Sequence, residues 1–219
     1  MNSCRTVRSV VRARTLRHAA LAAIVLVTTG LFVRFGSGDR LDNLSLATAW
    51  LCLILMAVAL SLGPLRVLQT NTPAINLQQR RDIGIWAALA GLAHLVAATA
   101  QSMSEQYMAI YVYISQGGIA ATTRAGLYAW GSVIGLLIGV VLLLLLGLSN
   151  NRVMNRLGPK RWKRLQRLAY PAFALTAVHG VMFQLLEFRS QFLVGILVLI
   201  TGVLVWLQLL GIRAVRKGR

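Results

Sequence analysis

Six long apolar runs dominate the pattern of hydrophobic and polar residues in this chain. Each is a mainly apolar run of 18 or more residues, the length that a helix needs to cross a bilayer. The runs are His18–Phe35, Leu44–Leu62, Asp82–Gln101, Leu127–Leu148, Leu168–Phe188 and Gln191–Ile212. Little chain is left between them, so we expect one all-α polytopic membrane bundle of six transmembrane helices. It would occupy residues 18–212, with basic cytoplasmic tails at residues 1–17 and 213–219.

The N-terminal run has a basic flank like that of a signal peptide, but no cleavage site of the A-x-A kind follows "AALAAIVLVTTGLFV". We therefore interpret it as the first span. The segment Ser102–Ala125, which includes "YMAIYVYISQGG", is expected on the outer side, either along the interface or as a loop over the bundle. The run "NNRVMNRLGPKRWKRLQRL" is expected to be a basic inner loop.

The composition agrees with a membrane protein, since 57% of the residues are hydrophobic and 13% are charged. The formal net charge is +18, with 23 lysines and arginines against five acids. If both termini lie inside, 19 of the 23 cations fall in inner segments, and only Arg34, Arg40, Arg124 and Arg189 lie outside or at outer ends. This asymmetry indicates orientation and contact with anionic lipids rather than nucleic-acid binding. We expect integral insertion in a bacterial inner membrane with both termini cytoplasmic.

Two of the three histidines lie deep inside predicted spans. His94 follows the start of the third span by 12 residues and His179 that of the fifth by 11, so both lie about 16–18 Å from the inner end. Ionisable side chains inside a bilayer usually mark a functional site with a partner. An imidazole from each of two helices can ligate haem iron, although a chlorin pigment or a hydrogen bond between helices also fits the pattern. His18, at the inner edge of the first span, is expected to face water or headgroups.

Small residues flank both histidines at helical spacing. Gly91 lies on the His94 face of the third span, and Thr176 supplies the one hydroxyl on the His179 face of the fifth. Gly180 is expected to leave room beside His179. These positions complete a candidate haem site in which His94 and His179 are the metal ligands.

Other chemistry finds no support in the sequence. "GLLIG" (Gly135 to Gly139) belongs to an apolar span and follows no strand, so it is not a phosphate loop. A set of catalytic serine, histidine and aspartate residues is missing too. Cys4 and Cys52 lie at different depths, which excludes a disulfide between them. A transporter is disfavoured because no inverted repeat, broken helix pair or buried acid is visible.

The stretches "LQQRRDIGIWAALAGLAHLV" and "LGPKRWKRLQRLAYPAFALTAVHGVMF" resemble the ferric reductase-like transmembrane domain family. Within it they are most similar to the MsrQ group, the haem b membrane subunits of periplasmic methionine sulfoxide reductase systems. The resemblance covers roughly Leu44–Phe188. It implies a six-helix bundle with b-type haem, and electron transfer from a cytoplasmic flavin or quinol donor to a periplasmic acceptor.

Carried over by position, the resemblance makes His94 and His179 the axial ligands. The family has a further histidine 13 positions before the second of these, where this chain has Gln166, and 13 positions before His94 stands Arg81. One haem is therefore expected rather than two. Arg80 and Arg81 would meet FMN or a haem propionate, or would simply anchor the inner end.

We expect a redox subunit that acts only with a redox partner protein or a larger membrane complex, since no nicotinamide-binding domain is visible. The alternative is a non-catalytic accessory subunit of a larger membrane complex, for example a pigment-bearing photosynthetic or respiratory one, with or without haem.

Overall fold

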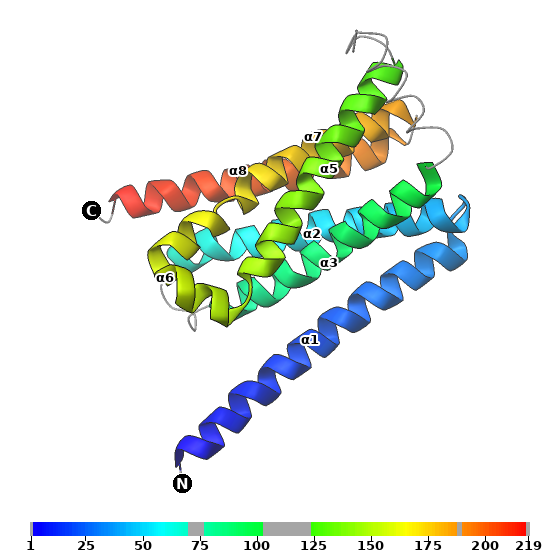
Figure 1. Cartoon of the computed structure of the whole chain (residues 1–219). Coiled ribbons are helices and arrows are strands. Elements are labelled where there is room, and N and C mark those ends of the chain that lie inside the picture. Colours follow the sequence, from blue (N-terminus) through cyan, green and yellow to red (C-terminus); the bar gives the residue numbers. More distant parts are fainter. Residues whose placement is uncertain (1, 70–76, 103–123, 188–189, 218–219) are drawn as a thin grey trace.

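The computed structural model describes residues 2–69, 77–102, 124–187 and 190–217, all of them in helices or short connections (Figure 1). Six of the helical stretches are long and apolar enough to cross a membrane, which confirms the predicted all-α class and the number of spans. The helices are α1 (Asn2–Phe35), α2 (Arg40–Leu68), α3 (Leu77–Ser102), α5 (Arg124–Leu148), α6 (Asn151–Gln166), α7 (Ala169–Leu186) and α8 (Gln191–Lys217).

Helix α2 is the centre of the bundle. It packs along α3 and α8 and also contacts α1 and α7, while α5 bridges α3 and α7. Its buried residues include Leu51, Cys52, Met56 and Leu60, which form the core together with small residues of α3 such as Ala87. Helix α1 lies on the outside of the bundle, against α2 and α3 (Figure 1).

The predicted basic inner loop is instead a helix, so that prediction was wrong. Asn150 caps α6 by accepting a hydrogen bond from the backbone N–H of Arg152 at 2.9 Å. Gly158 interrupts the helix with a φ of 75°, which glycine adopts readily, and Pro159 begins the second part. The indole of Trp162 donates to the carbonyl of Leu148 at 2.7 Å and so fastens α6 to the end of α5. The sequence missed this helix because its apolar positions are few and a glycine and a proline divide it.

The predicted tails are helical where the structure describes them. Helix α1 begins at Asn2 and α8 reaches Lys217, so residues 2–17 and 213–217 belong to these helices. That they lie outside the membrane stays a prediction. Most of the segment predicted at the outer interface, residues 103–123, lies outside the described residues.

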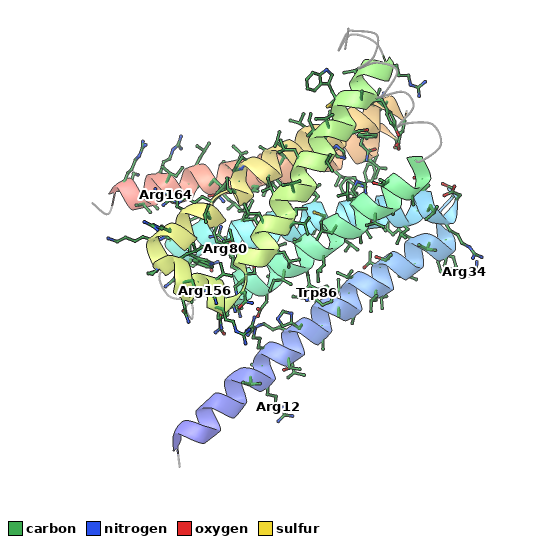
Figure 2. The ribbon with its side chains drawn as sticks, viewed as in Figure 1. Arg12, Arg34, Arg80, Trp86, Arg156 and Arg164 are labelled. Carbon is green, nitrogen blue, oxygen red and sulfur yellow. The ribbon has the colours of Figure 1, made fainter. Side chains whose placement is uncertain are left out.

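The start of α1, the end of α8 and α6 lie at the same end of the bundle, which we call the basic end (Figure 1). Arg80, Arg156 and Arg164 gather there, whereas Arg34 lies at the opposite end, beside the turn between α1 and α2 (Figure 2). Cations predicted in inner segments thus lie at one end of the bundle, and Arg34, predicted at an outer end, lies at the other. The side of the membrane on which the basic end lies stays a prediction.

Candidate haem site

His94 on α3 and His179 on α7 meet in the interior of the bundle. Their ring centroids are 6.1 Å apart and their planes cross at 79°, and both residues are half-buried. The prediction that the two imidazoles lie at one depth is therefore confirmed. Neither helix packs mainly on the other: α3 lies against α2 and α5, and α7 lies against α5, α2 and α8.

Each imidazole is held through its Nδ1 by a backbone carbonyl of a neighbouring helix. His94 Nδ1 lies 2.9 Å from the carbonyl oxygen of Ser45 on α2, and 3.1 Å from the hydroxyl of the same residue. His179 Nδ1 lies 2.9 Å from the carbonyl oxygen of Gly131 on α5. A carbonyl oxygen can only accept, so Nδ1 carries the proton in both rings. The neutral imidazole then has its free lone pair on Nε2, which is the arrangement typical of a metal-ligating histidine.

The two rings lie close together, since their centroids are 6.1 Å apart. With Nδ1 protonated in each ring, Nε2 is the atom that would hold a metal. The chemistry of this donor pair therefore fits a haem that His94 and His179 would hold.

Three glycines of α5, spaced four residues apart, open the space around the site. A Cβ at Gly135 would lie 2.8 Å from Cε1 of His179, and a Cβ at Gly131 would lie 2.6 Å from the ring of Phe183. A Cβ at Gly139 would lie 2.7 Å from Leu95 of α3. Small residues at four-residue spacing let membrane helices approach closely, and here they let α5 receive the His179 ring.

Gly180 lies where α7 meets α8. A Cβ there would lie 2.7 Å from Leu197 of α8, so this glycine permits close packing of the two helices. Its role in leaving room beside His179 stays a prediction.

An aromatic series continues from His179 toward the end of the bundle opposite the basic end. The ring of Phe183 lies 4.8 Å from that of His179, and the ring of Tyr128 lies 5.1 Å from that of Phe183. These contacts pack α7 against α5 and restrict the position of the His179 ring.

The other two predicted residues beside the histidines have other contacts in the structure. A Cβ at Gly91 would lie 2.5 Å from Leu142 and 2.8 Å from the sulfur of Cys52, so this glycine permits close packing of α3 on α5 and α2. The hydroxyl of Thr176 donates to the carbonyl of Ala172 in its own helix at 2.9 Å.

Arg80 and Arg81 lie at the basic end, about 20 Å along α3 from His94. The Arg80 side chain reaches toward Gly63 of α2. Arg81 donates to the side-chain oxygen of Asn151, while its Nε is buried without a hydrogen-bond partner. The Nε2 of Gln166 is likewise buried without a partner. Neither Arg81 nor Gln166 offers an imidazole for a second haem.

A buried carboxylate lies at the same end, which corrects the prediction that the chain has no buried acid. Asp82 is fully buried and is contacted by Arg14 at 3.2 Å, Arg17 at 3.2 Å and Nε2 of His18 at 3.3 Å, all from α1. His18 also accepts a hydrogen bond from the indole of Trp86 through Nδ1 at 3.1 Å. The expectation that His18 faces water or headgroups was therefore wrong, because both of its nitrogens contact α3.

Sequence reasoning missed the groups that orient the ligands. Ser45 and Gly131 act through backbone carbonyls, which every residue has, so no side-chain signal marks them. Gly135 was detectable, because Gly131, Gly135 and Gly139 form a small-residue pattern along one face of the span.

Comparison with known proteins identifies the family of the chain. No solved structure matches the chain. The model of the ferric reductase-like transmembrane component family matches residues 46–177, more than half of the 219 residues. The matched region contains His94 and ends two residues before His179. The chain therefore belongs to the ferric reductase-like transmembrane component family, which implies haem-containing electron transfer in a membrane.

Proposed function

We propose that this chain is a haem b-binding electron-transfer subunit of the MsrQ type, with one haem between α3 and α7. His94 and His179 are its axial ligands. The observation that carries this proposal is the matched pair of hydrogen bonds from Nδ1 to the carbonyls of Ser45 and Gly131. They leave two Nε2 lone pairs on rings whose centroids are 6.1 Å apart.

The protein's own residues prepare the site for this role. Fixing the tautomer of both rings removes the need to reorient them when the iron binds, and a hydrogen-bonded Nδ1–H makes Nε2 a more basic ligand. When bound, haem supplies reversible one-electron chemistry between ferric and ferrous iron. Two imidazoles, those of His94 and His179, would hold the group, an arrangement that suits electron exchange.

The number of histidines allows one haem with two histidine ligands. The sequence has three histidines, and the third, His18, contacts Trp86 through one nitrogen and Asp82 through the other. We therefore expect one haem per chain, and electron exchange with partner proteins. The basic end would face the cytoplasm and the donor, and the acceptor would lie on the outer side.

Optical spectra of the purified protein, oxidised and reduced with dithionite, test the proposal. We expect the sharp reduced bands of a six-coordinate b haem in the wild type. His94→Ala and His179→Ala should each lose the haem or convert it to a five-coordinate, high-spin form, because each removes one axial nitrogen.

His18→Ala is the control, since it removes an imidazole that lies at the basic end. Its haem spectrum per folded protein should be unchanged. A wild-type protein without haem bands, produced in cells that make haem, would overturn the proposal and favour the accessory-subunit alternative, and chlorin bands would indicate a pigment site. Retention of the wild-type spectrum by either ligand variant would show that the axial pair is wrong.

A further inference from the structure

A second polar site lies at the basic end, away from the two histidines. An open pocket of about 320 Å³ lies there between α1, α3, α5 and the start of α6. Its lining combines two guanidinium groups, two side-chain amides, one hydroxyl and an apolar wall. The lining residues are Arg14, Arg81, Ile85, Leu146, Ser149, Asn150 and Asn151.

The charges around this pocket do not balance. Asp82 is the one carboxylate at this end among the described residues, because Asp39, Asp42 and Glu187 lie at the opposite end. Its two oxygens are already engaged by Arg14, Arg17 and His18 of α1. The three positive charges of Arg14, Arg17 and Arg81 are therefore balanced by only one carboxylate among the described residues at this end.

Arg81 is the least satisfied of these cations. Its one described hydrogen-bond partner is a neutral amide oxygen, that of Asn151, and its Nε is buried without a partner. A buried donor that lacks an acceptor is costly, and more so when it belongs to a charged group. The pocket beside it therefore suits an anion whose oxygens can accept from the guanidinium.

We propose that this pocket binds the phosphate group of an anionic phospholipid. A guanidinium presents a planar set of donors that matches phosphate oxygens, and the neighbouring amides can add neutral hydrogen bonds. Basic pockets between helices at the cytoplasmic surface of membrane proteins are known to hold anionic headgroups. Ile85 and Leu146 form an apolar wall next to the polar groups, as the glycerol and upper acyl chain of a lipid require. Free phosphate shares the headgroup chemistry but would make no use of this wall.

Native mass spectrometry of the full-length protein in detergent tests the lipid site, with phosphatidylglycerol and phosphatidylcholine as probes. The two lipids share the phosphate and differ in net charge. We expect a bound phosphatidylglycerol on the wild type, with an affinity roughly tenfold or more above that of phosphatidylcholine. Arg81→Gln should remove that preference. Arg156→Gln is the matched control, because it makes the same change of charge on an exposed residue of α6 outside the pocket.

A second variant keeps the test decisive if Arg81→Gln does not fold. Ile85→Trp fills the pocket and leaves every charge in place, so it should also displace phosphatidylglycerol. Equal binding of phosphatidylglycerol by the wild type and both pocket variants would overturn the proposal, and so would equal binding of the two lipids. Displacement of the lipid by millimolar inorganic phosphate would identify a site for soluble phosphate and refute the lipid source. None of these outcomes depends on haem, so the test is independent of the function proposed above.

Discussion

The fit between Gly135 and the His179 ring gives the sharpest prediction. In Gly135→Ala the new methyl carbon would lie 2.8 Å from Cε1 and 3.3 Å from Nδ1 of His179, whereas ordinary contact begins at 3.4 Å. The ring must therefore move away from α5 by about 0.6 Å, because the close-packed interior leaves the backbone little room to move instead. Gly131 lies one turn away on the same helix. The hydrogen bond that Nδ1 of His179 donates to the carbonyl oxygen of Gly131 is 2.9 Å long. It would lengthen to about 3.5 Å, beyond the usual range.

The loss of that hydrogen bond has a measurable consequence for the cofactor. A buried donor left without its acceptor costs about 1–3 kcal/mol, which corresponds to a haem affinity lowered roughly 5- to 150-fold. Titration of the haem-free protein with haem, together with the haem content of the purified protein, measures this change. Gly147→Ala is the matched control: it makes the same substitution on the same helix, where an added Cβ would meet nothing within 4 Å. Wild-type haem affinity in Gly135→Ala would refute the placement of the His179 ring against α5.

Three further predictions follow from the topology and from the buried acid. Reporter fusions at Arg124 and Lys160 should report opposite sides of the membrane, with Lys160 inside, and the same side for both would refute the orientation. A pyridine haemochrome assay should give one haem per chain, whereas a ratio near two would show that ligands other than histidine hold a second haem. Asp82→Asn should lower the stability of the detergent-solubilised protein by about 1–3 kcal/mol, because two arginines lose their counter-charge. A thermal melt unchanged from that of the wild type would refute this.

The elements that the sequence predicted well are those whose signal is spread along a whole span. Apolar length predicted the six spans, and helical rise alone placed His94 and His179 at one depth, because a straight helix converts residue number into distance. Predictions that depended on a direction around a helix were less successful. His18 was assigned to water or headgroups, because the sequence does not show which face of a helix meets which partner.

The polar contacts between helices were the least predictable part. Asp82 stands among the first residues of a span, where a carboxylate ordinarily faces water. It is buried only because α1 brings Arg14, Arg17 and His18 across from more than 60 residues earlier in the chain. No sequence pattern marks the backbone carbonyls of Ser45 and Gly131 either, because every residue has a carbonyl. Such groups become visible only when the packing of the helices is known.

The attachment of α1 has a consequence for the order in which the protein assembles. The span of α1 has no buried residue in its most apolar window, and apolar side chains gain little when they exchange lipid for another helix. Its polar attachment to the bundle consists of the contacts with Asp82 and the hydrogen bond from Trp86 to His18. During synthesis α1 enters the membrane before α3 exists, so its arginines first rest among lipid headgroups. When α3 follows, the Asp82 carboxylate meets cations that are already in place, and it never has to face the bilayer without them.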